Sequence, residues 1–183
     1  KFDTKLILRI SGLPKLNFFR RFLWKFTNKK IQFVTVPTKE TVIKLKKMNL
    51  FDNSKIHYLP DPVFIENKIK KKIKIKINKK YGYILNVGRI TEQKNKKVLI
   101  NAFKKCQEKI PDAKLLLVGD GIELASLEKL AKDLGIEEHV VFTGYRDNVR
   151  AYQNSMDVCV FPSTTETFGL VAIETLLLGK PTI

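Results

Sequence analysis

The chain has 183 residues, of which 44% are hydrophobic and 29% charged, a composition typical of a folded, water-soluble protein of one or two domains. The net charge of +17 lies entirely in residues 1–80, which hold 22 Lys and Arg against 5 Asp and Glu, whereas residues 81–183 hold 13 of each. Two distant cysteines exclude a disulfide framework and a cysteine metal site, and no apolar run approaches the roughly 18–20 residues that span a bilayer, so a cytoplasmic protein is expected.

Residues 1–66 alternate short apolar runs with amphipathic segments. The pattern predicts strands over 5–10, 31–36 and 55–59 and helices over 18–26 and 39–48. Pro60 and Pro62 then interrupt it, and the Lys/Ile-rich run 67–80 has neither turn nor core signals. We therefore expect part of a first domain over residues 1–66 and an interdomain linker over residues 67–80.

Residues 81–183 repeat the alternation more regularly. Strands are expected over 81–88, 113–119, 139–144 and 157–163, and helices over 96–110, 122–136, 148–155 and 168–179. Strands that are continuously apolar, each followed by a helix, indicate a parallel sheet covered on both faces. The last helix is apolar around most of its circumference, which predicts burial. The pattern predicts a doubly wound α/β domain.

Two cations flank the loop VGRITEQKN, which follows the first of these strands. In doubly wound sheets, ligands bind beyond the carboxyl ends of the strands. Arg89 follows Gly88 at the strand end, and Lys94 lies at the start of the next helix. Two cations beside a helix N-terminus suit a diphosphate, and the alternative is a pair of solvated loop charges.

Two further loops carry weaker signals. The loop VGDGIE offers Gly119 and Gly121 without the spacing of a dinucleotide fingerprint or a P-loop, so a helix start with Asp120 near the N-cap is expected. In FTGYRDN, Gly144 and Tyr145 follow a strand. At this position we expect the backbone edge or the aromatic ring to contact a nucleobase, and the alternative is that Tyr145 is a half-buried packing residue.

The stretch FPSTTETFGLVAIETLLLGKP places one carboxylate on each side of a helix entrance. Glu166 lies in the loop, Thr167 is in position to cap the helix, and Gly169 permits a close approach of a ligand. Glu174 lies about 8 Å further along the helix. A phosphate at the entrance leaves both carboxylates to bind sugar hydroxyls. The alternatives are a buried salt bridge for Glu174 and a solvated loop acid for Glu166.

These motifs, together with VLINAF, LLLVGDG and VVFTGY, occur in an order that resembles one known family. It is the retaining, GT-B-fold glycosyltransferases known as group 1 or family four, and the pair Glu166 and Glu174 matches its E-x7-E signature. The resemblance covers about residues 81–183 and implies a Rossmann-like donor-binding domain. Residues 1–66 would then end the acceptor-side domain of a GT-B architecture truncated at both ends. The residue after the phosphate-binding lysine is often glycine in the family and is Asn95 here, which leaves Lys94 assigned.

The resemblance also implies roles for individual residues. Arg89 and Lys94 would bind the donor diphosphate and stabilise the departing nucleotide. Glu166 would contact the transferred sugar, and Glu174 the ribose. Further donor contacts are implied for Gly88, Gly144, Tyr145, Thr167, Phe168, Gly169 and Leu170.

The implied reaction moves a sugar from a UDP- or GDP-linked donor to a polysaccharide, lipopolysaccharide or glycolipid acceptor, with retention of configuration. We expect no cofactor and no metal ion, since Arg89 and Lys94 take the place of a divalent ion. A general base is not identifiable.

Residues 17–26, NFFRRFLWKF, mix cations with aromatic side chains. This mixture is typical of interfacial helices and suggests peripheral association with an anionic membrane surface, the inner face in a cytoplasmic protein. The alternatives are aromatic side chains that pack into the first domain, and a composition biased along the whole chain.

Three other functions compete with glycosyl transfer. A nucleic-acid-binding protein would suit the total charge, but no RRM or OB-like motif is present, so nucleic acid is not an expected partner. An inactive nucleotide-binding protein would not need all four of the charged site residues. A nucleotide-sugar epimerase of the same fold would need acid and base groups that the chain does not show.

Overall fold

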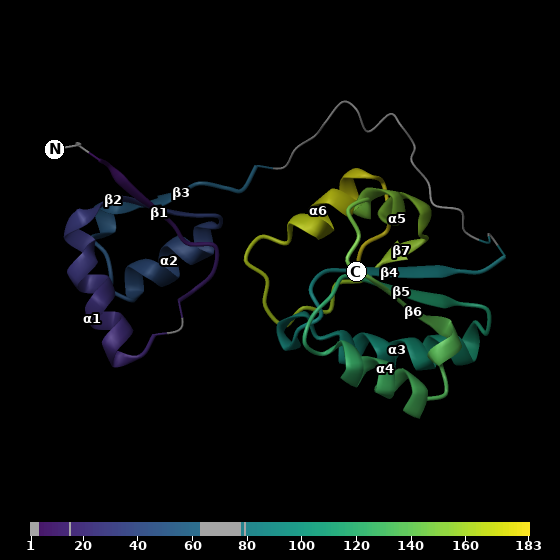
Figure 1. Cartoon of the computed structure of the whole chain (residues 1–183). Helices are drawn as coiled ribbons and strands as arrows, with labels where there is room; N and C mark the ends of the chain where they lie inside the picture. The colour runs from purple at the N-terminus through teal and green to yellow at the C-terminus, as the bar shows by residue number, and fades with distance from the viewer. Residues whose placement is uncertain (1–3, 15, 63–77, 79) are drawn as a thin grey trace. The chain divides into compact units, whose positions relative to one another are not determined.

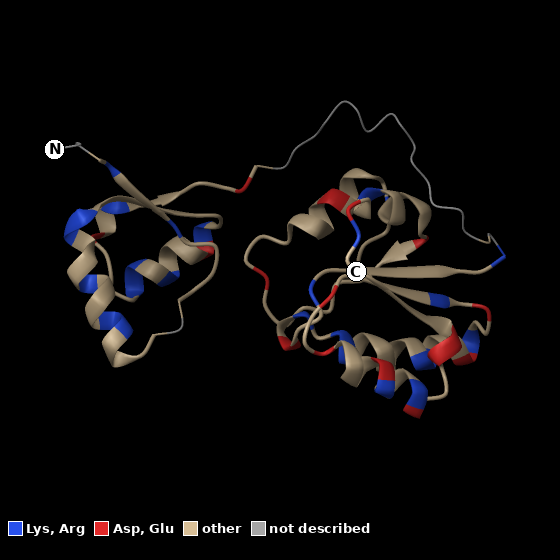
Figure 2. Cartoon of the chain, in the orientation of Figure 1, with Lys and Arg blue, Asp and Glu red and all other residues tan. Residues whose placement is uncertain are grey.

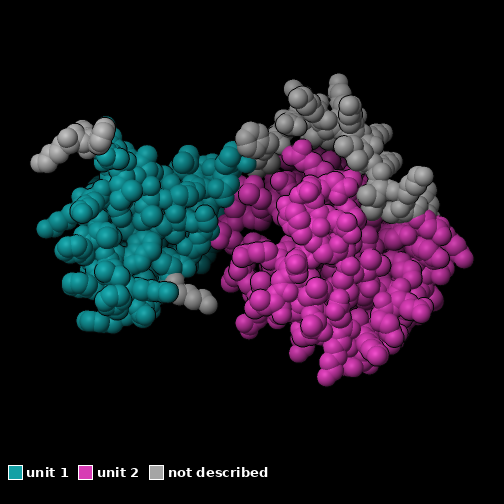
Figure 3. Space-filling model, in the orientation of Figure 1, with its two compact units in different colours: residues 1–62 teal, residues 63–183 magenta. Residues whose placement is uncertain are grey.

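The computed structural model describes residues 4–14, 16–62, 78 and 80–183 (Figure 1). The chain forms two compact units, residues 1–62 and 63–183 (Figure 3). The first unit ends at Pro62, ahead of the predicted domain end at residue 66. Nearly all of the predicted linker, residues 67–80, lies outside the described residues. The linker, and the assignment of residues 1–66 to an acceptor-side domain, stay predictions.

The first unit contains a small parallel sheet with the strand order β1-β2-β3. Its main elements agree with those predicted and are β1 (Leu6–Arg9), α1 (Phe18–Thr27), β2 (Ile31–Val36), α2 (Lys39–Lys47) and β3 (Ile56–Tyr58). Val34 and Val36 of β2 pack with Leu45 of α2 in the core. The hydroxyl of Thr38 caps α2, because it accepts a hydrogen bond from the N–H of Thr41 at 3.1 Å.

The second unit is a parallel sheet with the strand order β6-β5-β4-β7. Its main elements are β4 (Tyr83–Val87), α3 (Lys96–Lys109), β5 (Lys114–Val118), α4 (Leu124–Asp133), β6 (Val140–Gly144), α5 (Val149–Ser155), β7 (Val158–Cys159) and α6 (Leu170–Leu177). Each predicted element is present, although β7 is much shorter than the predicted range 157–163. The predicted doubly wound α/β fold is therefore confirmed for this unit.

The sheet of the second unit is buried on both faces. Leu115 and Leu117 of β5 belong to the core that includes Phe103 of α3, whereas Leu116 and Val118 point to the other face and its separate core. Figure 1 shows α3 and α4 along one face and α5 and α6 along the other. This arrangement explains why the strands are continuously apolar rather than alternating.

The prediction that the last helix is buried is wrong. In α6 only Thr175 is fully buried, while Leu176 is 58% and Leu177 44% exposed. The helix contacts the rest of the unit along one side, where Val171 packs against the core that contains Met156. Hydrophobicity around the whole circumference therefore did not predict burial, because only one face of α6 has a neighbour among the described residues.

Candidate functional site

The sheet of the second unit changes direction beside β4. The chain adds β5 and then β6 on one side of β4, and it then crosses over to add β7 on the other side. In doubly wound sheets, ligands bind beyond the carboxyl ends of the strands at such a switch point. The loops that follow β4 and β7, residues 88–95 and 160–169, are therefore the first candidates for a site.

Hydrogen bonds join these two loops directly. The carbonyl oxygen of Gln93 accepts from the N–H of Thr164 at 3.0 Å, and the side chain of Gln93 donates to the carbonyl oxygen of Thr165 at 2.9 Å. Next to these bonds, the Lys94 ammonium donates to Glu166 Oε1 and forms an ion pair with it. The fold thus brings together two predicted site residues that lie 72 positions apart in the chain.

The Glu166 carboxylate has a second partner within its own loop. The hydroxyl of Ser163 donates to the same oxygen, Oε1, at 2.9 Å. Both contacts therefore fall on one oxygen, and Oε2 is the atom available to a ligand. A carboxylate held in this way is oriented before any ligand arrives.

The loop after β4 folds back on itself. A Cβ atom at Gly88 would lie 3.8 Å from Lys94 Cε, so the lysine side chain passes close to Gly88. The next residue, Arg89, is exposed. Asn95 has φ 48° and ψ 40°, a left-handed conformation that glycine adopts most easily and that asparagine tolerates. Asparagine therefore fits the backbone that carries Lys94.

The loops after β4 and β5 approach each other through their backbones. A Cβ atom at Gly119 would lie 2.2 Å from the carbonyl oxygen of Gly88, and one at Gly121 would lie 2.2 Å from that of Ile90. Only glycine leaves room for such contacts. These glycines therefore support the loop of Arg89 rather than simply starting a helix as predicted.

Asp120 does not cap the following helix, contrary to our prediction. The N-cap of α4 is Glu123, and no side chain caps the helix there. Asp120 Oδ1 instead accepts from the N–H of Gly121 at 2.7 Å, and its carbonyl oxygen accepts from the N–H of Ile90 at 2.8 Å. The residue acts within the turn because the helix begins too far along the chain for it to reach.

A buried lysine behind the site was not predicted. Lys96, the first residue of α3, is 1% exposed, and its ammonium donates to Asn86 Oδ1 in β4. Asn86 Nδ2 donates to the carbonyl oxygen of Val160, just after β7, at 2.6 Å. Burial, with a smaller contribution from the charge of Lys94, lowers the pKa of Lys96 from 10.5 to about 8. This polar chain connects α3, β4 and the end of β7.

The entrance of α6 is built differently from the predicted one. Gly169, with φ 71°, is the N-cap residue, and no side chain caps the helix, so the predicted cap by Thr167 is wrong. Thr167 precedes the cap by two residues, which places its hydroxyl out of position for the first helical N–H groups. Thr167 and Phe168 are half-buried, and Leu170 is exposed at the first position of α6.

Glu174 is half-buried on α6 rather than enclosed. Within the part of the chain that the structure describes, no hydrogen bond or ion pair engages its carboxylate, so the alternative of an internal salt bridge finds no support there. The structure does not join Glu174 directly to the pair of Lys94 and Glu166.

Gly144 and Tyr145 lie at the carboxyl end of β6. The carbonyl oxygen of Gly144 accepts from the N–H of Gly119 at 2.9 Å, which joins this end of β6 to the loop after β5. Tyr145 is 75% exposed, so the alternative of a half-buried packing residue does not hold. Asp147 accepts a hydrogen bond from the phenol and repels its anion, and both effects raise the pKa of Tyr145.

Comparison with known proteins identifies the family. The family model for glycosyl transferases group 1 matches residues 67–183. The chain belongs to glycosyl transferases group 1. The resemblance predicted from the loop motifs is thereby confirmed at the level of the family.

Two relatives of this group 1 chain are bacterial proteins. It is 36% identical over 100 residues to the lipopolysaccharide core biosynthesis glycosyltransferase LpsE of Rhizobium meliloti, covering 55% of this chain and 28% of LpsE. It is 28% identical over 181 residues to a Campylobacter jejuni enzyme, N-acetylgalactosamine-N,N'-diacetylbacillosaminyl-diphospho-undecaprenol 4-alpha-N-acetylgalactosaminyltransferase, covering 94% of this chain and 48% of the enzyme.

A solved structure supports the GT-B fold of this group 1 chain. HepE from Anabaena, solved in complex with UDP and glucose, superposes with a TM-score of 0.77 at 18% identity, over 97% of this chain and 52% of HepE. The chain thus spans about half the length of HepE and of the Campylobacter enzyme, and less of LpsE.

The described residues of this group 1 chain lack two features. No three His, Cys, Asp or Glu side chains in that part of the chain lie close enough together to hold a metal ion. Within the same residues, no helix is both long and apolar enough to cross a bilayer.

Proposed function

We propose that the second unit binds the nucleotide-sugar donor of a retaining glycosyltransferase. The observation that carries the proposal is the ion pair between Lys94 and Glu166, which joins the loops after β4 and β7 at the switch point of the sheet. A cation for a phosphate and a carboxylate for a sugar are thereby neighbours. A nucleoside diphosphate sugar presents these two groups side by side.

In this proposal Lys94 and Arg89 bind the diphosphate. Breaking the bond between sugar and phosphate leaves negative charge on the departing nucleotide, and fixed cations stabilise that charge more in the transition state than in the ground state. An ammonium has three N–H donors, so Lys94 can keep Glu166 and still bind a phosphate oxygen. Arg89 is exposed next to Gly88 and is free to approach the same group.

The carboxylates take the sugar hydroxyls. Glu166 Oε1 is engaged by Lys94 and Ser163, so Oε2 would accept from a hydroxyl of the transferred sugar. Glu174, on α6 and without a partner among the described residues, would accept from the ribose. The remaining donor contacts proposed are the backbone or side-chain groups of Gly88, Gly144, Tyr145, Thr167, Phe168, Gly169 and Leu170.

The acceptor class is inferred from relatives. The R. meliloti relative is named for lipopolysaccharide core synthesis, and the C. jejuni relative for a sugar linked to diphospho-undecaprenol. We infer a polysaccharide, lipopolysaccharide or glycolipid acceptor, and a cytoplasmic location, for the whole protein. HepE was solved with UDP, which favours a UDP-linked donor over a GDP-linked one.

NMR of the anomeric proton of the product would test whether the reaction retains the configuration of the sugar.

Calorimetric titration of the chain with UDP, GDP and UDP-glucose tests the donor site. We expect Lys94→Ala and Glu174→Ala to weaken nucleotide binding at least about tenfold, since each loses a charge-assisted hydrogen bond. Glu166→Gln should weaken UDP-glucose more than UDP. Glu92→Gln, an exposed neighbour in the same loop, is the control and should bind as the wild type does.

Two outcomes would contradict the donor site. One is nucleotide binding that none of the three variants changes. The other is salt-sensitive binding of a single-stranded oligonucleotide without any nucleotide binding, which would favour the charge-driven alternative.

A further inference from the structure

Aromatic side chains cover the outer side of α1 in the first unit. Phe18 is 91% exposed, Phe19 67%, Phe22 62% and Phe26 70%. With Leu23, which is 42% exposed, they form what we call the α1 face. Contiguous exposed apolar surface of this kind is uncommon on monomeric proteins and marks interaction sites.

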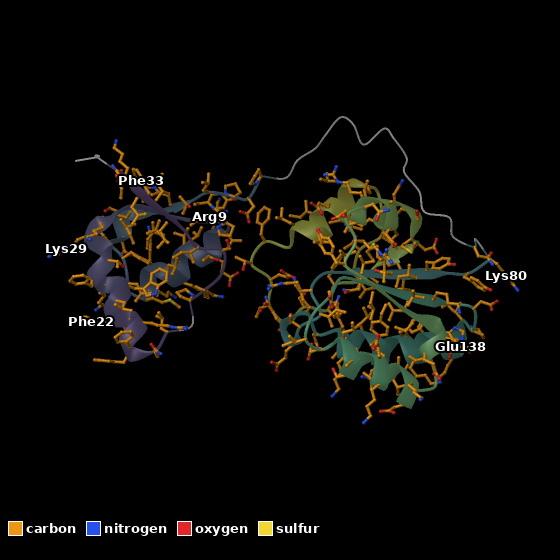
Figure 4. The ribbon with its side chains drawn as sticks, in the orientation of Figure 1. Arg9, Phe22, Lys29, Phe33, Lys80 and Glu138 are labelled. Atoms are coloured by element: carbon orange, nitrogen blue, oxygen red, sulfur yellow. The ribbon has the colours of Figure 1, made fainter. Side chains whose placement is uncertain are left out.

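Helical geometry gathers these side chains on one side. Phe18, Phe22 and Phe26 follow one another at intervals of four residues, which places them in a row along the helix, and Phe19 and Leu23 form the adjacent row. No residue of α1 is fully buried. Figure 4 shows Phe22 on the outer side of the helix.

The opposite side fixes the helix to the unit. Trp24 packs edge-on against Phe51 of the core, with ring centroids 5.3 Å apart. Arg21 donates to the carbonyl oxygen of Met48 at 3.2 Å. Asn17 caps the helix by accepting from the N–H of Arg20 at 2.8 Å. The α1 face is therefore held outward by packing and hydrogen bonds on its other side.

Cations border the α1 face. Residues 17–30 contain five Lys and Arg and no Asp or Glu. By helical phase, Arg21 and Lys25 lie along one edge of the face and Arg20 along the other. Lys29 and Lys30 follow at the C-terminal end, and Figure 2 shows the cations along this helix. An aromatic face with cationic edges is the pattern of helices that lie in the headgroup region of a membrane.

We propose that the α1 face docks the first unit on an anionic lipid surface. The phenylalanines would enter the boundary between headgroups and acyl chains, and the bordering cations would lie at the lipid phosphates. The alternative that these aromatics pack into the first domain finds no support among the described residues, where they are exposed. A second copy of the chain is the less favourable occupant, since it would place the cations of two identical faces against one another without a carboxylate to pair them. The proposal does not depend on the donor site.

Sedimentation with vesicles tests the proposal on the 183-residue chain. We expect binding to vesicles that contain phosphatidylglycerol, little binding to pure phosphatidylcholine, and weakening by salt. Trp24 is the single tryptophan of the chain and lies on the same helix, so its emission should change on binding. The double variant Phe22→Ser and Phe26→Ser should lower the partition coefficient at least about tenfold, because each phenylalanine buries a large apolar area.

Matched control variants distinguish vesicle binding through the α1 face from non-specific adsorption. Ile122→Ser removes an apolar side chain that is 93% exposed in the second unit, and it should leave vesicle binding unchanged. Lys25→Glu should weaken binding to anionic vesicles, whereas Lys129→Glu, an exposed lysine of α4, should have less effect.

Three results would overturn the proposal. Vesicle binding that the double phenylalanine variant leaves intact would be the first, and binding that is independent of anionic lipid would be the second. The third is a chain that dimerises in solution through the α1 face, as light scattering would show if the dimer disappears in the same variant.

Discussion

Burial of Lys96 makes the stability of the second unit depend on pH. The folded chain lowers the pKa of this group to about 8, first through burial and then through the charge of Lys94, whereas the unfolded chain leaves it at 10.5. Between these values the unfolded chain holds a proton that the folded chain has released, so the free energy of unfolding rises with pH. From about pH 7 to about pH 9.5, a shift of this size contributes about 2 kcal/mol.

The variant Lys96→Met isolates this contribution, because it keeps the length of the side chain and removes its titration. Urea unfolding followed by circular dichroism would be measured for both proteins at the two pH values. The wild type should gain about 2 kcal/mol relative to the variant as the pH rises. At the lower pH we expect the variant to be close to the wild type in stability, since removing a buried ammonium offsets the loss of the hydrogen bond to Asn86.

Lys97→Met is the control, since Lys97 is the exposed next residue of the same helix. The difference between this variant and the wild type should stay constant with pH. If the difference between the wild type and Lys96→Met is also constant, the reasoning about burial is refuted.

Two further predictions concern packing in the second unit. Gly119→Ala places a Cβ atom 2.2 Å from the carbonyl oxygen of Gly88 at a φ of 133°, so it should cost at least about 3 kcal/mol in urea unfolding and weaken UDP binding. Gly135→Ala, with φ 63° and open space around the new atom, should cost only about 1 kcal/mol, and equal costs for the two variants would count against the close approach. Gln153 is fully buried; its Oε1 has no partner among the described residues, but its Nε2 donates to Thr175 Oγ1 at 2.8 Å. Gln153→Met removes both the unpaired oxygen and this hydrogen bond, so the two effects should offset each other to within about 1 kcal/mol in the same assay. A loss of more than about 2 kcal/mol would show that the amide is needed there.

Periodicity was sufficient to predict the elements and the fold class. The apolar runs of β4, β5 and β6 lie between helices on both faces, and that burial is what makes them continuously apolar. The rule for the carboxyl ends of the strands led to the loops of Lys94 and Glu166. Their ion pair was not predictable, because the two residues lie 72 positions apart and meet only because β4 and β7 become neighbours in the sheet.

The local errors have a common physical origin. In the sequence KNKK, residues 94–97, all three lysines look exposed, yet Lys94 is half-buried, Lys96 buried and Lys97 exposed. The spacing does contain the signal, since Lys96 lies three and four residues before the buried Leu99 and Ile100 and therefore on the same side of the helix. For α6 the opposite error occurred: apolar residues predicted to be buried are exposed, because hydrophobicity alone does not show whether a neighbouring element covers that face of the helix.

Because hydrogen bonds join the loops after β4 and β7, the proposed donor site can form only after both loops have been synthesised. Ribosomes release a chain from its N-terminus, so β4, β5 and β6 can form a sheet while the carboxylate that pairs with Lys94 is still unmade. A product interrupted before residue 166 would keep most of the sheet and lack the pair. The donor site that we propose can therefore form only after residue 166 has been made, later than the sheet of β4, β5 and β6.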